Sequence, residues 1–415
     1  MRIWLVTVGE PLPLNGNEVR LLRAGILARL LLARGHDVTW WTSSFNHSQK
    51  RQHTDETIEL QLPGEPRMIL LHGTAYQKNL SPLRIVNHVQ IAREFGRLCA
   101  AESRPDIILC SFPTIELSRA AVEYGRRNRV PVILDVRDLW PDIFADVAPG
   151  MLRPLARMLL FPAFHHTRQA LAHCTAVIGI SKEYLEWGLK AGSRAKTDLD
   201  RVFPLGYEQR EWPAYRLAEA GEILRAVGAA PDRFLCWFAG MFGRTYDLST
   251  VIEAARLLER RSPNRFQFIL CGTGERYEEW TEQASGLSSV VFPGWVDAAQ
   301  LAWLMKSSKA GLAAYAAGAP QGLPNKVFEF LCAGIPVISS LRGETEQLLS
   351  EYECGMTYTA GDPESLAGVL TRLADNEAVW RALGENARRL FEARFDARQV
   401  YGDLADYLEE TARSF

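Results

Sequence analysis

The stretch Pro320-Gln-Gly-Leu-Pro-Asn-Lys-Val-Phe-Glu-Phe-Leu-Cys-Ala-Gly-Ile-Pro-Val-Ile-Ser339 joins a polar loop, a short helix and a buried strand. Pro324 suits the first turn of the helix, because the N–H that proline lacks would have no partner there. Gly334 is placed to end the helix, and Val337-Ile338 begins an apolar strand. This order of elements is typical of an α/β protein with a parallel sheet.

Lys326 and Glu329 are three residues apart, so they share one face of this helix near its N-terminus. That end of a helix offers free N–H groups and a positive dipole, which together favour a phosphate. A nucleotide would suit the pair, with Lys326 at its diphosphate and Glu329 at its ribose hydroxyls. The spacing also fits an ordinary surface ion pair, so both interpretations stay open.

The composition limits the class of protein. The chain has 415 residues, which is enough for two or three domains. Its net charge of -2 argues against a nucleic-acid partner. Seven scattered cysteines without a Cys-x-x-Cys pair favour reduced, buried thiols in a cytoplasmic protein. No apolar run reaches the roughly 18 residues of a membrane span.

Strands and helices alternate along the chain, which predicts α/β architecture with two doubly wound domains facing across a cleft. We expect an N-terminal domain over 1–203, with the helix 396–415 packing back on it, and a second domain over 204–395. A first helix is predicted from the stripe Val19, Leu22, Ile26 and Leu30, with Asn17 as its N-cap. Strands are predicted at 3–8, 38–42, 69–71, 107–110, 132–136, 177–180, 235–239, 266–271, 290–292, 311–314 and 336–339.

Several loops of the second half follow strands, where ligands bind in α/β sheets. Gly240-Met-Phe-Gly243-Arg244 would bring backbone close to a ligand, and Arg244 could pair with phosphate oxygens. Its spacing is neither Gly-x-Gly-x-x-Gly nor a Walker loop, and a tight turn with a surface arginine fits as well. Gly274 closes the next strand. Trp295, beside Val296, could stack on a ligand or pack in the core.

In the first half, Asp135-Val-Arg137-Asp138-Leu-Trp-Pro-Asp142 ends a buried strand with three carboxylates and an arginine. Charges crowded at the carboxyl end of a strand indicate a site. An ion pair of Arg137 with an aspartate, capping the next helix, is the alternative. No His/Cys cluster has zinc spacing, so we expect no metal site.

Taken together, these motifs show that the chain resembles the family-4 retaining glycosyltransferases, which have the GT-B fold. Within that family the 135–142 stretch looks most like the bacterial surface-polysaccharide branch, near the N-acetylfucosaminyl transferases. The resemblance rests on motifs in the family's order: the Gly9–Gly16 loop with its helix and Arg34-Gly35-His36-Asp37-Val38, Asp135–Asp142, Ile180-Ser181, Phe203-Pro-Leu-Gly206, Gly240–Arg244, Phe292–Val296 and Leu323–Ser339.

The resemblance implies roles for the candidate residues. Arg244 and Lys326 would hold the donor diphosphate and carry the catalytic charge role, while Glu329 would bind the ribose. Arg137 and Asp138 would orient the acceptor or the transferring sugar. The implied donor-binding set also contains Gly16 of the phosphate loop, Gly243, Gly274, Trp295, Val296, Gly318, Gln321, Leu323, Pro324 and Asn325.

Three positions depart from the family's pattern. Gln321 stands where the family has the first glutamate of its Glu-x7-Glu motif, so it supplies hydrogen bonds without charge. No lysine follows Arg244, and Arg137 replaces the family's common active-site histidine. The last change looks typical of the polysaccharide branch.

The expected function is transfer of a hexose or N-acetylhexosamine from a nucleotide diphosphate sugar, with retention and without a metal or cofactor. UDP is the first expectation for the nucleotide and GDP the second. The acceptor would be a sugar or lipid-linked sugar in surface polysaccharide or lipopolysaccharide synthesis, at the cytoplasmic face of the membrane. A catalytically silent nucleotide-sugar-binding partner and a GT-B nucleotide-sugar epimerase are the alternatives.

The stretch from Arg153 to Phe164 mixes cations with large apolar residues. Such a mixture suits peripheral contact with a membrane, but it also suits a helix buried in the core. The sequence leaves both interpretations open.

Overall fold

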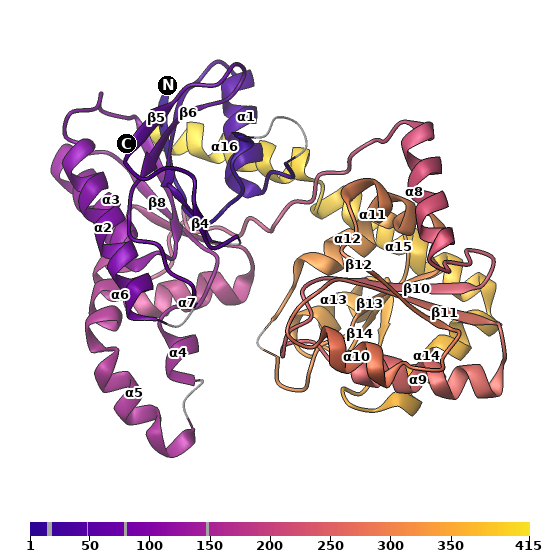
Figure 1. The fold of residues 1–415 in the computed structure, drawn as a ribbon. Helices are drawn as coiled ribbons and strands as arrows, with labels where there is room; N and C mark the ends of the chain where they lie inside the picture. The colour runs from indigo at the N-terminus through magenta and orange to yellow at the C-terminus, as the bar shows by residue number, and fades with distance from the viewer. Residues whose placement is uncertain (15–18, 48, 79–80, 147–148, 320) are drawn as a thin grey trace. The chain divides into compact units, whose positions relative to one another are not determined.

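A computed structural model describes residues 1–14, 19–47, 49–78, 81–146, 149–319 and 321–415. The chain divides into two compact units, and Figure 1 shows the first in indigo to pink together with the yellow C-terminal helix and the second in rose to yellow. Unit 1 comprises residues 1–205 and 397–415, and unit 2 comprises residues 206–396. Each unit carries its own sheet of parallel strands, so the predicted α/β fold is confirmed.

The sheet of unit 1 has the strand order β5-β6-β2-β1-β7-β8-β9, and β5 alone among them runs antiparallel, at the edge. Its strands are continuous apolar runs because helices cover both faces. A short hairpin of β3 (Phe45–Asn46) and β4 (Arg51–Gln52) follows β2. The sheet strands are β1 (Arg2–Val6), β2 (Asp37–Ser43), β5 (Ile58–Leu60), β6 (Arg67–Leu71), β7 (Ile107–Phe112), β8 (Val132–Val136) and β9 (Ala176–Gly179).

Two groups of helices cover the two faces of this sheet. On one face α1 (Arg23–Ala33) and the C-terminal α16 (Ala397–Ser414) pack on Ile3 and Leu5. On the other face, α2, α3, α6 and α7 pack around Trp4 and Trp41. These helices span Pro82–Leu98, Ile115–Asn128, Phe161–His173 and Lys182–Gly192, and the segment before α6 holds α4 (Asp142–Asp146), a 3-10 turn (Gly150–Leu152) and α5 (Arg153–Leu159).

The first helix begins later than predicted. It starts at Arg23, so Val19 and Leu22 lie before it, and the expected N-cap Asn17 lies outside the described residues. The carboxylate of Glu10 accepts a hydrogen bond of 2.9 Å from the Ala24 N–H. A distant side chain therefore caps this helix, which the local pattern could not reveal.

Unit 2 repeats the strand path of unit 1. Its order β12-β11-β10-β13-β14-β15 is the doubly wound order of a dinucleotide-type fold. All strands are parallel, and the order in which they are added to the sheet reverses between β10 and β13. Its strands are β10 (Phe234–Ala239), β11 (Phe266–Cys271), β12 (Val290–Gly294), β13 (Ala310–Ala313), β14 (Val337–Ser339) and β15 (Gly355–Thr357). Its helices are α8 (Ala214–Ala226), α9 (Leu248–Arg261), α10 (Tyr277–Gln283), α11 (Ala298–Ser307), α12 (Asn325–Ala333), α13 (Glu344–Glu351), α14 (Pro363–Asp375) and α15 (Glu377–Arg394).

The helix predicted after Pro324 is α12. Pro324 is its N-cap in an extended conformation, one position earlier than the first turn predicted for it. Gly334 ends the helix with a φ of +66°, a left-handed conformation that favours glycine.

All seven cysteines are free and buried, as predicted. Burial raises the pKa of the Cys110 thiol to about 12. Within the described ranges no helix is both long and apolar enough to cross a membrane.

Candidate functional site

The donor-side candidates of unit 2 gather at one edge of its sheet. Gly243 and Arg244 follow β10, Gly274 follows β11, and Trp295 with Val296 follows β12. Gly318 and Gln321 come after β13, before α12. These four strands are neighbours in the sheet and all run parallel, so their carboxyl ends share one edge. This edge includes the point where the strand order reverses, which is the usual ligand site of such sheets.

Lys326 lies at the centre of this edge. Its side chain is buried, and its ammonium group donates a hydrogen bond of 2.5 Å to the carbonyl of Ala239, the last residue of β10. The rings of Phe238 and Tyr246 lie 4.5 and 4.6 Å from the same nitrogen. A lysine ammonium has three N–H donors, so two remain for a ligand after the bond to Ala239.

Glycines bring the loops of this edge close together. A Cβ at Gly240 would lie 2.4 Å from the Lys326 nitrogen, so the missing side chain makes room for the ammonium. Gly272 has a φ of +145°, and a Cβ there would lie 1.9 Å from the carbonyl oxygen of Gly240. The close backbone approach therefore requires glycine at position 272, whereas glycine at position 240 leaves space for the Lys326 ammonium group.

Arg244 and Trp295 extend into solvent at the same edge. Arg244 is 90% exposed and pairs weakly with Glu275 at 3.4 Å. Trp295 is 71% exposed, so the alternative that it packs in the core is wrong. Because neither Arg244 nor Trp295 packs in the core, both side chains are available to a ligand.

Gln321 on the loop and Glu329 on the helix lie on either side of Lys326 in the sequence. The side-chain oxygen of Gln321 is buried and accepts no hydrogen bond from any described residue. Such an atom costs stability unless a ligand or water satisfies it. Glu329 is 8% exposed on the buried face of α12, with Lys326, rather than at the surface. The loop residues Leu323 and Pro324 are half-buried and Asn325 is exposed, while Gly16 lies outside the described residues.

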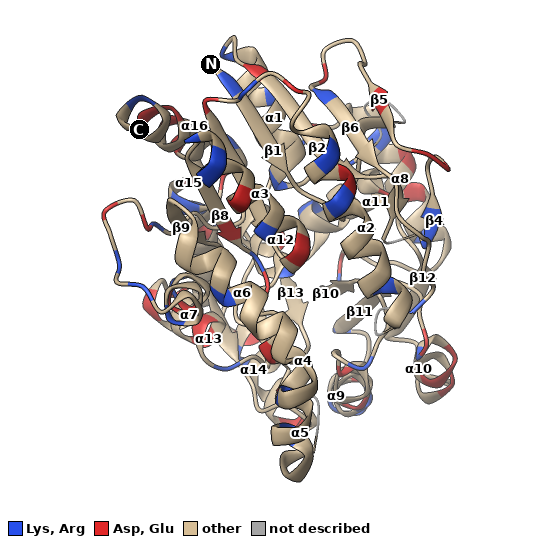
Figure 2. Ribbon diagram, turned by 90° about the vertical axis from the view of Figure 1, so that its left-hand side faces the viewer, with Lys and Arg blue, Asp and Glu red and all other residues tan. Residues whose placement is uncertain are grey.

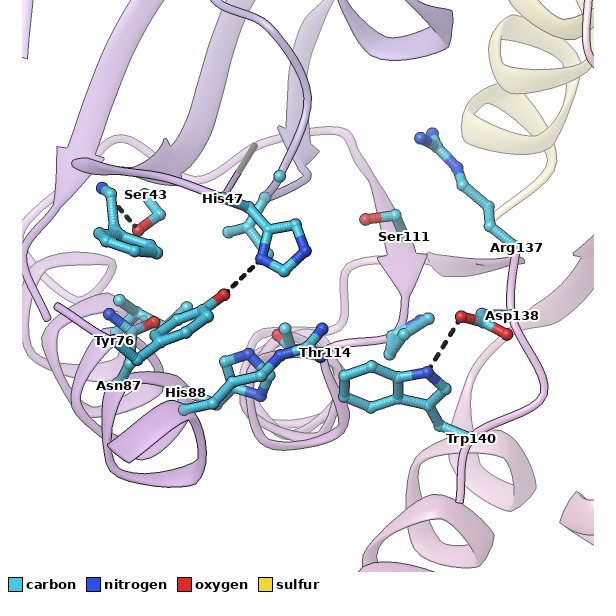
Figure 3. Close-up of a pocket in the computed structure, with 16 residues that line it drawn as sticks. Ser43, His47, Tyr76, Asn87, His88, Ser111, Thr114, Arg137, Asp138 and Trp140 are labelled. Carbon is cyan, nitrogen blue, oxygen red and sulfur yellow. Dashed lines mark hydrogen bonds between the residues drawn. The ribbon is translucent and has the colours of Figure 1, made fainter. Parts of the chain in front are cut away.

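Unit 1 has a cavity of about 250 Å³ at the carboxyl ends of its own strands (Figure 3). Arg137, Asp138 and Trp140, which follow β8, form one wall. The remaining lining residues come from the ends of β1, β2 and β7, from the β3–β4 hairpin, from the loop after β6 and from α2: Val8, Gly9, Ser43, Phe45, His47, Tyr76, Arg84, Asn87, His88, Ile91, Ser111, Pro113 and Thr114.

Arg137 belongs to a closed ring of charges. Its Nε lies 2.7 Å from Asp135, and its Nη1 contacts Glu10. Asp135 also accepts two bonds from the buried Arg23, of 2.8 and 3.0 Å, and Glu10 caps the residue after Arg23. Burial by itself would raise the pKa of Asp135, but the two guanidinium groups hold it below the usual value. The ring fixes Arg137 against one side of the cavity, so the predicted ion pair is present and Arg137 still lines the site.

Asp138 faces the other way from Arg137. Its carboxylate accepts hydrogen bonds from the Leu139 N–H at 2.9 Å and from the Trp140 indole at 3.0 Å. Burial raises the pKa of Asp138, although these two bonds oppose the shift. The two bonds fix the indole of Trp140 in the cavity wall (Figure 3).

The sequence did not point to His47, Tyr76, Arg84 or His88. His88 stacks on Trp140 with ring centres 5.8 Å apart, and the Arg84 guanidinium lies 4.4 Å from the centre of the Trp140 ring. His47 Nδ1 and the Tyr76 hydroxyl are 2.6 Å apart. A signal was present in α2, where the polar residues Arg84, Asn87 and His88 occupy spacings normally apolar on a buried face.

Burial controls the charge of both histidines. Burial, with smaller effects from Arg84 and His47, lowers the pKa of His88 to about 3. The pKa of His47 falls to about 4, again mainly through burial, with Lys50 and Arg84 adding to the effect. Both imidazoles are therefore neutral near pH 7, and the positive charge of the cavity belongs to the arginines.

Both units match known families. Residues 22–199 match the "Glycosyl transferase 4-like domain" and residues 233–376 match "Glycosyl transferases group 1". A curated relative, the amylovoran biosynthesis glycosyltransferase AmsK of Erwinia amylovora, is 32% identical over 95 residues. That match spans 23% of this chain and 23% of the relative.

Solved structures share the architecture over nearly the whole chain. Sucrose-phosphate synthase from Thermosynechococcus elongatus has a TM-score of 0.70 at 18% identity, covering 100% of both chains. HepE from Anabaena, solved with UDP, has a TM-score of 0.68 at 16% identity, covering 99% of this chain and 100% of HepE. WaaG, a glycosyltransferase involved in lipopolysaccharide biosynthesis, has a TM-score of 0.64 at 16% identity, covering 98% of this chain and 99% of WaaG.

The fold and these similarities define a protein of the GT-B class. Because the two family matches together take in more than half of the chain, it belongs to the glycosyltransferases that combine these two domains.

Proposed function

We propose that this protein transfers a hexose or N-acetylhexosamine from a nucleotide diphosphate sugar to a sugar acceptor, with retention at the anomeric carbon. Within the glycosyltransferases we assign it to the retaining family 4, in the surface-polysaccharide branch near the N-acetylfucosaminyl transferases. The observation that carries the proposal is the position of Lys326, a buried cation at the N-terminus of α12 that touches the end of β10.

The edge around Lys326 suits a nucleoside diphosphate. A buried ammonium and the N–H groups of a helix N-terminus both favour a phosphate, and the exposed Arg244 can add a bidentate contact. Glu329 would accept bonds from ribose hydroxyls, and the unsatisfied oxygen of Gln321 would accept one from a hydroxyl of the sugar. UDP is the first choice of nucleotide, since HepE structures contain UDP and UDP-glucose.

The cavity of unit 1 suits a sugar acceptor. Its walls combine the aromatic rings of Trp140, Tyr76 and Phe45 with the hydrogen-bonding groups of Asp138 and Arg137. Sugars commonly present one apolar face and a rim of hydroxyls, which such a wall can satisfy. The similarity to AmsK, over 95 residues, supports an acceptor in polysaccharide synthesis, and we propose a lipid-linked one.

The chemistry would place charge on the leaving diphosphate. The bond from the anomeric carbon to the diphosphate oxygen breaks, and the acceptor oxygen bonds to the same face of that carbon. The acceptor's hydroxyl proton passes to the departing diphosphate. Lys326 and Arg244 would stabilise the developing negative charge, so no protein nucleophile is needed.

A thermal-shift screen with UDP, GDP, ADP and dTDP tests the donor site directly. A ligand at 100 times its dissociation constant stabilises a protein by about 2.7 kcal/mol, which is readily visible. We expect a shift with UDP that UDP-sugars enhance. Stabilisation by none of the four nucleotides, in folded protein, would overturn the donor site.

Products distinguish the proposed transfer from other reactions on the same donor. NMR of the anomeric proton in the glycosylated acceptor should show the configuration of the donor sugar. An inverted product would refute retention. Release of an epimerised sugar without acceptor would indicate an epimerase, and donor binding without turnover on a broad acceptor panel would indicate a silent binding partner.

A further inference from the structure

The helix α5 and the turns beside it form an apolar projection of unit 1, on the same side of the sheet as the cavity. The chain leaves β8, lines the cavity at Asp138 and Trp140, and continues through α4 into the segment 149–161 before α6 returns. Figure 1 shows α5 extending away from the sheet of unit 1.

Large apolar side chains on this projection lie in solvent. No residue of α5 or of the 3-10 turn before it is buried, and the structure describes both elements completely. The alternative of a core helix is therefore wrong for this segment. The exposed fractions are 95% for Met151, 52% for Leu152, 49% for Leu155, 66% for Met158, 71% for Leu159 and 66% for Phe161. A contiguous apolar surface of this kind marks an interaction site.

The apolar and cationic residues occupy opposite faces of α5. Leu155, Met158 and Leu159 share one face through their i, i+3 and i+4 spacing, whereas Arg153 and Arg157 lie on the other. Arg157 is held by Asp142 of α4 at 3.2 Å, which orients its face of the helix toward the rest of unit 1. The apolar face therefore points outward.

The charge around the projection identifies its partner. No Asp or Glu occurs between Asp146 and Glu183, a stretch that contains Arg153, Arg157, Arg168, Lys182 and three histidines. In Figure 2 α5 is tan and blue. A partner with an anionic surface and an apolar interior complements both the positive charge and the exposed apolar side chains of this segment.

We propose that the segment 149–161 inserts into the interface of a bilayer with anionic headgroups, with Leu155, Met158 and Leu159 among the acyl chains. Arg153 and Arg157 then reach back to the headgroups, as the long cationic side chains of interfacial helices do. Trp140 of the cavity wall packs edge-on against Phe144 of α4, with ring centres 4.7 Å apart. The inserted segment thus connects to the cavity through α4, and a lipid-linked acceptor, which rests on the proposed function, could enter it from the bilayer.

Vesicle flotation of the full chain tests this inference. Vesicles of phosphatidylcholine containing phosphatidylglycerol should carry the protein, and those without phosphatidylglycerol should carry less. The double variant L155S/L159S should bind at least about tenfold more weakly, because it removes two large apolar groups from the insertion. R153Q/R157Q should reduce the preference for phosphatidylglycerol.

The matched control is I223S/V227S at the C-terminal end of α8, which removes two apolar side chains that are 47% and 48% exposed and have the same i, i+4 spacing. It should float like the unaltered protein. Absence of flotation with either vesicle, or equal flotation of L155S/L159S, would overturn the inference. Self-association that L155S/L159S abolishes, without flotation, would identify a second copy as the partner and overturn it as well.

The UDP thermal shift separates this inference from the proposed function. L155S/L159S should retain the shift, which shows that the variant is folded. A protein that responds to UDP but never floats would refute membrane docking alone. Flotation without any nucleotide response would refute the donor site alone.

Discussion

The ammonium group of Lys326 and the carbonyl of Ala239 are joined by a hydrogen bond of 2.5 Å, across 87 positions of the sequence. This bond ties the N-terminus of α12 to the carboxyl end of β10. It places a positive charge where the strand order of the unit 2 sheet reverses.

Removing this charge should lower turnover by orders of magnitude while the fold survives. Lys326→Met keeps most of the side-chain volume, so we expect kcat to fall by about 10²–10³-fold, the usual cost of losing one charge-stabilising group. Steady-state kinetics with the donor found in the thermal-shift screen measure the effect. Lys306→Met, at an exposed position of α11, is the control and should retain full activity. Normal turnover of the Lys326 variant would refute the assigned role.

A methyl group at Gly240 should displace the ammonium without unfolding the unit. A Cβ there would lie 2.4 Å from the Lys326 nitrogen, the far end of a flexible side chain that can move. We expect Gly240→Ala to lose the UDP thermal shift while its own melting temperature changes little. Gly368→Ala, on α14 with open space around it, is the matched control. An equal UDP shift in both variants would count against the site.

Arg244 should contribute to donor binding and not to stability. Its side chain is 90% exposed and its pair with Glu275 is long, so Arg244→Ala should change the free energy of unfolding by less than about 0.5 kcal/mol. The dissociation constant of the donor should rise about tenfold or more, as a charged hydrogen bond is lost. Calorimetry measures it, with Arg260→Ala at the end of α9 as the control.

The buried ion pair of Arg23 should contribute more to the stability of unit 1 than an exposed ion pair does. Its guanidinium is 1% exposed, pairs with Asp135 and donates to the carbonyls of Phe203 and Pro204. Arg23→Met leaves buried Asp135 with one partner, so we expect a loss of about 3–5 kcal/mol in the free energy of unfolding. Arg2→Met breaks a more exposed pair with Asp37 and should cost at most about 1 kcal/mol. Denaturant unfolding of both variants makes the comparison.

His88 should make the protein less stable in mild acid. Its pKa of about 3 lies below the unfolded value of about 6.5, so the unfolded chain alone takes up a proton between these limits. The contribution of His88 to the free energy of unfolding should be fully present above about pH 6.5. It should fall by about 1.4 kcal/mol for each pH unit below that value. His47 acts in the same direction, and Glu116 lies 4.0 Å from His88.

The variant His88→Gln isolates this contribution. Unfolding free energies measured between pH 7 and 4 should decline less steeply than in the unaltered protein. Equal slopes for the two proteins would refute the predicted role of His88.

Much of the fold follows from local pattern. The strands predicted at 132–136 and 266–271 have the observed bounds, because apolar runs and turn residues define them. The start of α1 did not follow, since its cap, Glu10, lies 14 residues before Ala24. Arg23, which begins the helix, is buried only because Asp135, 112 positions away, pairs with it.

The two candidate sites differ in how far the sequence could place their residues. In unit 2, Arg244 and Trp295 follow strands and Lys326 lies in the helix after β13, so a parallel sheet brings them to one edge. In unit 1 the same rule pointed to Arg137 and Asp138, which line the cavity. His47, Tyr76 and His88 come from a loop, another loop and a helix, and only the folded chain brings them to Trp140. Their spacing in the sequence therefore does not predict that these side chains lie close together.

The burial of all seven cysteines has a practical consequence for site-specific labelling of the two units. Buried thiols with a raised pKa, such as Cys110, form little of the thiolate that reacts with maleimides. A pair of cysteines introduced at exposed positions, one in each unit, should therefore label selectively in the native protein. Fluorescence energy transfer between the two dyes can then measure the distance between the units, with and without a nucleotide sugar, while every native residue of the core is kept.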